Sequence, residues 1–280
     1  MDIFQAIILG VIQGLTEFIP ISSSAHLIIV PWLFGWQDPG LAFDLALHLG
    51  TLVALLWFFA SDWIRLLRAG VASIIERKLG DDVDCRLAWF IVLASIPGAI
   101  AGFLLEGKIE DWFHQPNAPH NSTPMLAMGI IVALLGAALF IAERTAKHLR
   151  GMKSLTLKDA VLIGVAQAFA VFPGVSRSGA TITAGLFLNL TRETAARFSF
   201  LLSAPLIAGA GAKSMLDVAR KGMPTSELIF FGVGFLVAML SGYLCIRFLL
   251  RFLQRNSTDL FVYYRWLLAG LVIAIALMRG

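Results

Sequence analysis

One sequence pattern occurs twice in this chain, 154 residues apart, and each copy places polar residues within strongly apolar sequence. The copies are GVIQGLTEFIPISSS at residues 10–24 and GVAQAFAVFPGVSRS at residues 164–178. Identical residues at this offset include Gly10 and Gly164, Gln13 and Gln167, Phe18 and Phe172, Ser22 and Ser176, and Ser24 and Ser178. Repeated apolar segments that are broken by glycine or proline are typical of membrane proteins with a buried site. Because the first copy carries Glu17 and is followed by His26, whereas the second carries Arg177, we expect two halves of one site.

The composition requires a membrane environment. Of 280 residues, 58% are hydrophobic and only 14% are charged, whereas about 25% of the residues of a soluble domain are charged. A soluble core cannot bury this much apolar surface, so we predict a single integral membrane domain over residues 1–280. We expect membrane lipids around the protein and no nucleic-acid partner.

Six apolar segments are each predicted to cross the bilayer as a helix. They are Phe43–Ala60, Leu87–Leu105, Met125–Ile141, Ala195–Leu216, Leu228–Phe248 and Tyr264–Met278, the last beginning as early as Leu260. Two further apolar regions, residues 3–34 and 157–190, are interrupted near the middle by proline, glycine and serine. Proline removes a backbone donor, and such a break is tolerated in hydrocarbon only inside protein or along a wet cavity. Both regions are therefore predicted to be re-entrant helical hairpins.

The predicted fold is an all-α polytopic membrane protein with six transmembrane helices and two re-entrant hairpins, arranged as an inverted repeat. Residues 1–145 form the first repeat and residues 155–280 the second; three spans in each half invert the second half. On this topology one side receives 16 Lys and Arg residues, Arg265 among them, and the other side receives 5. The richer side is cytoplasmic, so both termini and the mouth of the first hairpin face outward. The amphipathic stretch Asp62–Leu79 is expected along the inner membrane interface.

Glu17 is the first candidate for chemistry. It lies four residues after Gln13, on the same helical face, and ionisable side chains inside membrane segments are usually functional. Its carboxylate would bind a divalent cation or handle a proton; alternatively, it is held neutral by hydrogen bonds to Thr16 or a serine. A Mg²⁺ or Ca²⁺ ion at Glu17 would need further oxygens from substrate phosphate, serines and water.

A serine cluster, Ser22, Ser23 and Ser24, follows Pro20 and precedes a predicted helix. Hydroxyls and free backbone N–H groups at the start of a helix favour an anion. A simple N-cap by Ser22 or Ser24 is the structural alternative. The adjacent His26 is a candidate general base or nucleophile, or else a core histidine with satisfied hydrogen bonds.

The second copy carries the strongest motif, PGVSRSGAT at residues 173–181. Gly174 and Gly179 would let the backbone approach a ligand closely. Arg177 offers a planar fork for phosphate oxygens, or a structural salt bridge to Glu17. The expected substrate-binding residues are Gln13, Ser22, Ser24, Gly174, Ser176, Ser178 and Thr181. Together these groups predict a phosphate-bearing anion in a membrane pocket. Asp44 and His48 line the entrance or satisfy each other.

The chain resembles the undecaprenyl-diphosphate phosphatase family, also called bacitracin-resistance proteins, over essentially its whole length. The resemblance is most specific at QGLTEF of residues 13–18, SSSAH of residues 22–26, HLGT of residues 48–51 and the motif of residues 173–181. It implies a bacterial inner-membrane enzyme that removes the terminal phosphate of a polyprenyl diphosphate lipid, regenerating the carrier of cell-wall precursors and conferring bacitracin resistance. It also implies an outward-facing, periplasmic site and a divalent cation. Gln13 stands where family members carry Glu or Gln, so the acid role falls on Glu17.

The expected catalytic residues are Glu17, Ser23, His26 and Arg177. Arg177 and the region of Ser176 hold the diphosphate, a cation near Glu17 neutralises charge, and Ser23 attacks phosphorus with His26 as base. In a variant of this mechanism, His26 is the nucleophile and Ser23 only binds.

Two other classes of protein deserve comparison. A transporter or flippase of a polyprenyl phosphate lipid would share the inverted repeat with broken helices. Lipid phosphatases of the vanadium-haloperoxidase type need a histidine downstream of their Ser-Arg motif. In this chain no histidine follows His148, so this class is excluded.

Gly232 and Gly234 allow close helix packing, within one chain or between the copies of a homodimer.

Overall fold

The computed structural model describes residues 1–37, 39–77, 82–113, 122–221 and 228–279. The regular structure of these residues is helical, apart from one isolated β-bridge between Arg150 and Leu190. The helices are α1 (Ile3–Thr16), α2 (Ser23–Phe34), α3 (Leu41–Phe58), α4 (Ala60–Ile75), α5 (Val83–Phe113), α6 (Ser122–Thr145), η1 (Met152–Ser154), α7 (Leu157–Ala168), η2 (Phe169–Val171), α8 (Arg177–Phe187), α9 (Arg192–Lys221), α10 (Leu228–Leu253) and α11 (Asp259–Arg279).

Five of the described helices are long and apolar enough to cross a membrane. The qualifying segments lie in α5, α6, α9, α10 and α11. The pair α3 and α4 makes a sixth if it is one span, although it is bent by 79° at Phe59. Five of the six predicted spans lie on one helix each, whereas Phe43–Ala60 crosses the bend at Phe59 and ends on the first residue of α4. Helix α11 begins at Asp259, close to the early limit predicted for it. The chain is therefore an all-helical, multi-pass membrane protein.

The two apolar regions with internal prolines are both broken, at matching places. Helix α1 ends at Thr16 and α2 begins at Ser23, while η2 ends at Val171 and α8 begins at Arg177. The residue before each second helix is a serine with a left-handed backbone, with φ of 77° at Ser22 and 68° at Ser176. We call residues 17–22 the first bend and residues 172–176 the second bend.

The first helix of each repeat copy packs on a helix of the other half. Helix α1 lies against α10, and α7 lies against α5. A Cβ atom on Gly10 would lie 2.9 Å from the carbonyl oxygen of Gly234, and one on Gly164 would lie 2.5 Å from that of Ala94. These glycines occupy matching positions in the two copies, and both allow two helix backbones to approach closely. The close packing predicted for Gly234 thus occurs within one chain, where Gly234 also contacts the ring of Phe43 in α3.

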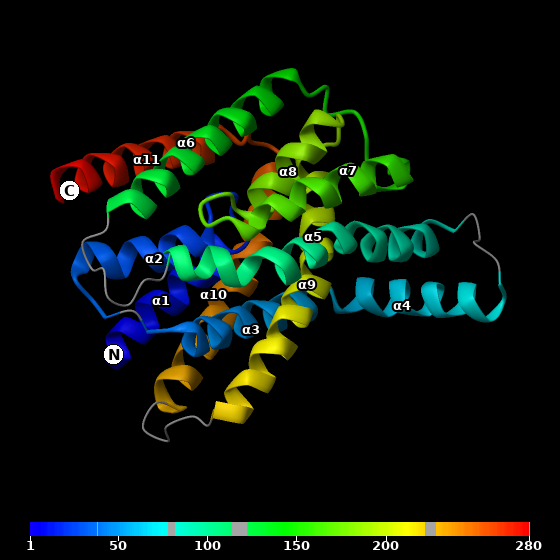
Figure 1. Ribbon diagram of the computed structural model, residues 1–280. Helices are drawn as coiled ribbons and strands as arrows, with labels where there is room; N and C mark the ends of the chain where they lie inside the picture. The colour runs from blue at the N-terminus through cyan, green and yellow to red at the C-terminus, as the bar shows by residue number, and fades with distance from the viewer. Residues whose placement is uncertain (38, 78–81, 114–121, 222–227, 280) are drawn as a thin grey trace.

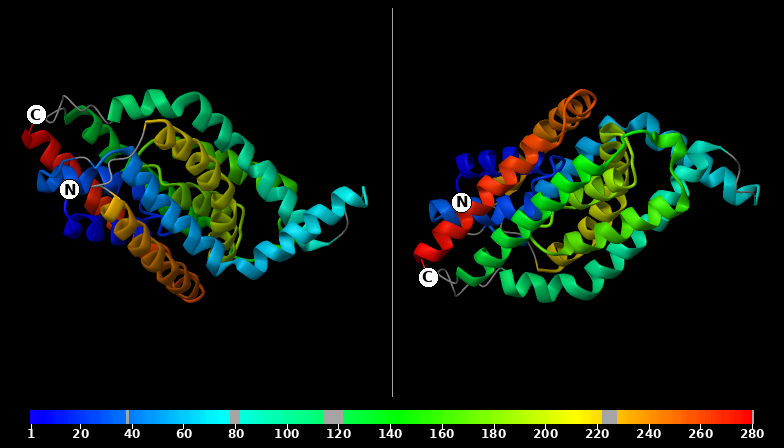
Figure 2. Two further views of the ribbon diagram at one scale, coloured as in Figure 1. Left: turned by 90° about the horizontal axis from the view of Figure 1, so that it is seen from below. Right: turned by 90° about the horizontal axis from the view of Figure 1, so that it is seen from above.

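Figure 1 shows how these helices enclose the two bends. Helices α6 and α11 run side by side along one edge, and α9 and α10 extend to the opposite edge. Helix α4 and the beginning of α5 project away from the other helices, as both views of Figure 2 show. The two ends of the chain lie at one end of the molecule in every view. A buried cluster that includes Phe18, Leu55, Phe198 and Phe200 packs beside the first bend.

Helix α4 matches the predicted amphipathic stretch, of which residues 78 and 79 lie outside the described part of the chain. Apolar side chains on it are exposed, including those of Ile64 and Leu67. Its buried Asp62 accepts hydrogen bonds from Arg65 at 2.5 Å and from Arg197 of α9 at 2.6 Å. The pair with Arg197 joins the start of α4 to α9.

We expect Gly164→Ala to destabilise the protein, because its Cβ would lie 2.5 Å from the Ala94 carbonyl oxygen and backbone atoms cannot yield as a flexible side chain does. Overpacking of this kind costs about 1–3 kcal/mol, so the thermal unfolding midpoint in detergent should fall. The matched control is Gly102→Ala in α5, where nothing lies within 4 Å of the added atom. That control should unfold at or above the wild-type temperature, since alanine is the better helix former. Equal midpoints for both variants would contradict the packing described.

Candidate active site

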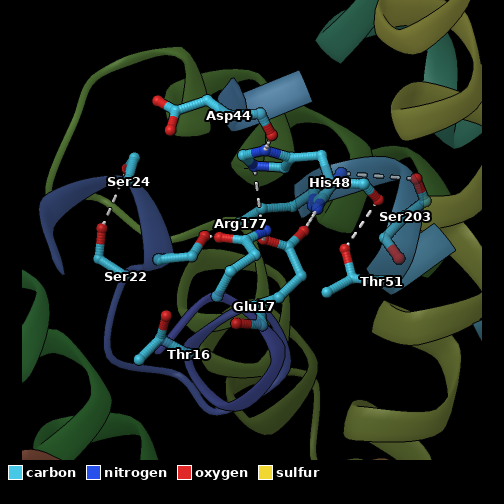
Figure 3. Close-up of polar contacts among 12 residues, drawn as sticks. Thr16, Glu17, Ser22, Ser24, Asp44, His48, Thr51, Arg177 and Ser203 are labelled. Carbon is cyan, nitrogen blue, oxygen red and sulfur yellow. Dashed lines mark hydrogen bonds and ion pairs between the residues drawn. The ribbon is translucent and has the colours of Figure 1, made fainter. Parts of the chain in front are cut away.

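Glu17, at the end of α1, is the centre of a buried polar cluster drawn in Figure 3. Its Oε2 atom accepts a hydrogen bond from Gln13 Nε2 at 3.0 Å and another from Ser23 Oγ at 2.7 Å. Its Oε1 atom forms an ion pair with Arg177 Nη2. The carboxylate therefore joins the first bend, the start of α2 and the start of α8. Thr16 is not part of this set, because its hydroxyl donates to the carbonyl oxygen of Ile12.

The ion pair shows that the two repeat copies meet, and it is also the salt bridge to Glu17 that was the structural alternative for Arg177. A carboxylate buried in a membrane protein is unfavourable unless it is paired and hydrogen-bonded. Here the guanidinium supplies the charge, while the amide and hydroxyl supply donors. The second amino group of Arg177, Nη1, lies 3.5 Å from the carbonyl oxygen of Ser203 in α9. The side chain that carries the cation is thus held between two halves of the protein.

Ser23 and His26 are both in α2, but the structure does not join them by a hydrogen bond. The Ser23 hydroxyl donates to Glu17. His26 Nδ1 lies 2.6 Å from the carbonyl oxygen of Ser22, and Nε2 lies 2.8 Å from the Tyr264 hydroxyl. A carbonyl oxygen only accepts, so Nδ1 carries the proton and, in the neutral ring, Nε2 accepts from Tyr264. The group in contact with the Ser23 proton is therefore a carboxylate, and the imidazole is held by other partners.

The serine pairs of the two bends have the same local geometry. Ser22 caps α2 by accepting from the backbone N–H of Ala25, and Ser176 caps α8 in the same way from Gly179. Each capping hydroxyl also lies 3.2 Å from the hydroxyl two residues later, that of Ser24 or Ser178. The N-cap predicted as the structural role is confirmed at Ser22. The Ser178 hydroxyl also lies 3.2 Å from the carbonyl oxygen of Ile19 in the first bend. The two helix starts with paired hydroxyls therefore lie in one region, which is suited to an anion.

Two residues of the second motif have protein atoms as close neighbours. Gly174 adopts φ of 96°, and a Cβ atom there would lie 3.2 Å from the carbonyl oxygen of Met128. Its role in the fold is the left-handed turn of the second bend. The Thr181 hydroxyl lies 2.6 Å from the Ser199 hydroxyl of α9. It ties α8 to α9.

His48 in α3 reaches the cluster, although the sequence suggested only a place at its entrance. Its Nδ1 lies 2.8 Å from the backbone carbonyl of Asp44, and its Nε2 lies 3.7 Å from Glu17 Oε2. Its side chain is 33% exposed, so it borders the cluster on an accessible side. Among the described histidines, His48 is the one whose imidazole lies within 4 Å of the Glu17 carboxylate. The signal was the motif of residues 48–51, which the family resemblance had singled out.

The position of Arg265 differs from the one predicted from the distribution of charges. The sequence placed it with the cytoplasmic residues, but its side chain is fully buried. Its guanidinium donates to the carbonyl oxygens of Pro20 and Val175, one in each bend. It lies six residues inside α11, within a segment apolar enough to span the membrane. An arginine inside such a segment was the signal that could have found it.

The residues around Glu17 fit a hard divalent cation only with help from a ligand. Among the described residues, no group of three or more His, Cys, Asp and Glu side chains could hold a metal ion. However, the Oε1 atom of Gln13 is buried without a hydrogen-bond partner in the described structure. With the Glu17 carboxylate and the Ser23 hydroxyl it offers three oxygen donors. Mg²⁺ and Ca²⁺ prefer such oxygens and complete their shells with phosphate and water.

Fold and site together define a class: a multi-pass helical membrane protein with a buried site of carboxylate, hydroxyl and guanidinium groups. The comparisons with known proteins make this specific. The chain belongs to the bacitracin resistance protein BacA family, whose family model matches residues 6–271. This confirms the family expected from the motifs.

Several relatives align over nearly their whole length, and each is named undecaprenyl-diphosphatase. The protein of Geobacter sulfurreducens is 47% identical over 100% of both chains. That of Thermomicrobium roseum is 46% identical over 98% of both chains. That of Pelotomaculum thermopropionicum is 46% identical over 98% of this chain and 97% of its own.

The ion pair predicts a strong non-additive effect on stability. Arg177→Met should lower the free energy of unfolding by about 3–5 kcal/mol, because it leaves the Glu17 carboxylate buried without its cation. The double variant Glu17→Gln with Arg177→Met should recover most of that loss, since no charge is then unpaired. Thermal unfolding of purified protein in detergent measures both changes. Additive losses in the double variant would show that the two side chains are not coupled.

Proposed function

We infer that this chain is a membrane hydrolase that converts undecaprenyl diphosphate to undecaprenyl phosphate and inorganic phosphate, and so confers resistance to bacitracin. The observation that carries this proposal is the 2.7 Å hydrogen bond from the Ser23 hydroxyl to Glu17 Oε2, beside Arg177. A hydroxyl in contact with a carboxylate is the arrangement that activates a nucleophile. The names of the relatives support a hydrolase over a transporter or flippase, which would need these groups only for binding.

In the first step, Ser23 Oγ attacks the terminal phosphorus and its proton passes to Glu17 Oε2. The bond between phosphorus and the bridging oxygen breaks, so undecaprenyl phosphate leaves and the phosphoryl group remains on Ser23. Glu17 thereby takes the role of base that the sequence suggested for His26, because Glu17 is the hydrogen-bond partner of Ser23. His26, held by Ser22 and Tyr264, would orient the start of α2.

In the second step, water attacks the phosphoryl group of Ser23, the bond between phosphorus and Ser23 Oγ breaks, and inorganic phosphate leaves with both hydrogens of the water. The proton that Glu17 gained in the first step returns to Ser23 Oγ. Arg177 stabilises the negative charge on the phosphoryl oxygens through both steps. To bind these oxygens, Arg177 must give up part of its contact with Glu17. The ion pair weakens once the Glu17 carboxylate carries the proton from Ser23.

The remaining polar groups would bind the diphosphate. We propose the paired hydroxyls Ser22 with Ser24 and Ser176 with Ser178, since both pairs stand at the start of a helix. Gln13 would hold Glu17 in place. Gly174 would shape the second bend and Thr181 would fix α8 on α9, so both support the binding site from behind.

A divalent cation, Mg²⁺ or Ca²⁺, would be held by the oxygens of Gln13, Glu17 and Ser23. The unpartnered Gln13 Oε1 supports this assignment. When bound, the cation neutralises negative charge on the phosphate oxygens. Gln13 contributes an amide oxygen in place of a second carboxylate, and the two proposed steps need only the carboxylate of Glu17.

We also propose that the chain has six spans and two re-entrant hairpins in an inverted repeat, with both termini and the site on the periplasmic side of the inner membrane. The reciprocal packing of α1 on α10 and of α7 on α5 supports the repeat. The two ends of the chain lie at one end of the molecule (Figure 2), as an even number of spans requires. The excess of Lys and Arg on the opposite side supports the orientation.

Hydrolysis is tested by phosphate release from undecaprenyl diphosphate by purified protein in detergent with Mg²⁺ or Ca²⁺. We expect turnover by the wild type, a loss of kcat of about 10²–10⁴ in Glu17→Gln because the base is removed, and at least as large a loss in Ser23→Ala. The matched control is Ser95→Ala in α5, whose hydroxyl donates only to the carbonyl oxygen of Ile91 among the described contacts.

The wild type would bind the lipid without releasing phosphate if the protein were a transporter. Retained turnover in Ser23→Ala, with a phosphorylated histidine recovered at residue 26, would make His26 the nucleophile instead.

The topology is tested by labelling single cysteines with a membrane-impermeant maleimide, in cells whose outer membrane alone is permeabilised. Asp2→Cys should react, because the N-terminus is outside. Lys147→Cys should not, because the segment between the repeats is cytoplasmic. Both positions are exposed in the structure, so accessibility to the reagent is not limited by the fold. The reverse pattern would overturn the proposed orientation, and reaction at both positions would overturn the three spans proposed for the first repeat, because an odd number of crossings must separate residue 2 from residue 147.

A further inference from the structure

Arg265 has the largest fully buried side chain of the described residues, and it touches both bends. Its Nε donates to the carbonyl oxygen of Pro20 at 2.5 Å, and its Nη2 donates to that of Val175 at 3.1 Å. Pro20 lies two residues before Ser22, and Val175 is the residue before Ser176. One planar guanidinium therefore spans from the first bend to the second, at the points where the chain turns toward the serine pairs.

The two carbonyl groups need such a donor. Both lie between helices, where the regular ladder of backbone hydrogen bonds is interrupted. A buried carbonyl without a partner is unfavourable, most of all where the bilayer keeps water away. A guanidinium suits this task because its five N–H groups form a rigid fork that reaches two acceptors at once.

Stability alone does not account for a charge at this place. Among the described residues, Arg265 forms no ion pair with a carboxylate, and its Nη1 is buried without a hydrogen-bond partner. A buried charge without a counter-ion is unfavourable. The arginine thus contributes a fixed geometry to the two bends at the expense of stability.

Two neighbouring residues complete the link. A Cβ atom on Gly179 would lie 2.6 Å from Arg265 Nη2, so only glycine leaves room for the guanidinium beside α8. The Ser178 hydroxyl lies 3.2 Å from the carbonyl oxygen of Ile19 and forms a second contact between the bends. Ser23 and Glu17 belong to the first-bend side of this link and Arg177 to the second-bend side, and the ion pair between Glu17 and Arg177 joins the two sides.

We propose that Arg265 is a positioning residue for phosphate removal. Its guanidinium sets the separation of the two bends, and this separation places the nucleophile and carboxylate of the first half against the Arg177 cation of the second. The proposal rests on the proposed hydrolase function. Arg265 does not itself touch the substrate, so its loss should impair the chemical step more than binding.

The test compares Arg265→Met and Arg265→Lys in the phosphate-release assay, per folded molecule as judged by gel filtration and thermal unfolding. Misplacing reacting groups by about 1 Å costs about 10²-fold in rate, so kcat should fall about 10–100-fold in Arg265→Met while KM stays within about threefold. Lysine donates from a single nitrogen and cannot span both bends, so Arg265→Lys should lie between methionine and the wild type. A merely structural role would reduce the folded fraction and leave kcat per folded molecule unchanged.

A second arm moves the guanidinium without removing it. Gly179→Ala should lower kcat in the wild-type background, because the added atom displaces Arg265. It should have little further effect in Arg265→Met, since no guanidinium is left to displace. The matched control is Gly270→Ala in α11, where nothing lies within 4 Å, and it should keep the wild-type kcat.

Three outcomes are separable. Wild-type kcat in folded Arg265→Met overturns the positioning role. Equal effects of Gly179→Ala in both backgrounds also overturn it, because the added atom would then act through Ser176, whose Cβ it would approach to 3.0 Å, and not through the guanidinium. No turnover by the wild type would instead contradict the hydrolase function.

Discussion

A bilayer offers no water to the backbone of a broken helix, so the two bends of this protein depend on partners within the fold. Much of the centre of the molecule meets that requirement. Ser22 and Ser176 cap the helices that follow the bends, and Arg265 donates to a carbonyl oxygen in each of them. The polar groups collected for this purpose are also the groups that a diphosphate would need. The polar residues that stabilise the bends are therefore largely the same residues that are proposed to bind the diphosphate.

The two repeat copies share a scaffold and divide the chemistry. The matching glycines Gly10 and Gly164 allow close helix contact, and the matching serines turn the chain with the same left-handed backbone. The charged groups do not match, since Glu17 belongs to one copy and Arg177 to the other. An ion pair between the copies is possible only because they differ at these positions. The residues that the two copies share thus build the scaffold, and the residues that differ form the ion pair of the site.

The sequence predicted what depends on composition and on alignment of the repeat. The spans follow from apolar length, the breaks follow from proline and glycine, and the meeting of Glu17 with Arg177 follows from complementary charges at the two breaks. The partner of Ser23 was not predictable in this way. His26 is nearer in sequence, but the path of the first bend brings Glu17 to the hydroxyl, and this path depends on tertiary contacts.

Arg265 and His48 show the same limit. A census of charges assigns an arginine near the beginning of a helix to the adjacent aqueous side, and only packing reveals that Arg265 points inward. His48 lies on a helix far from the bends in sequence, and its approach to Glu17 depends on how α3 packs in the bundle. The sequence signals at these two positions mark the residues as candidates, but they do not say which way each side chain points.

The exchange of first helices between the halves has a consequence for biosynthesis. Helix α1 is made first, yet the surface on which its glycines pack belongs to α10, which begins at Leu228. While the ribosome extends the chain, α1 stays in the translocon or in lipid, and its face with Gly10 and Gly14 is not yet packed on α10. The packing of α1 on α10 therefore awaits the synthesis of α10, and a nascent chain interrupted before Leu228 would leave the glycine face of α1 without its partner.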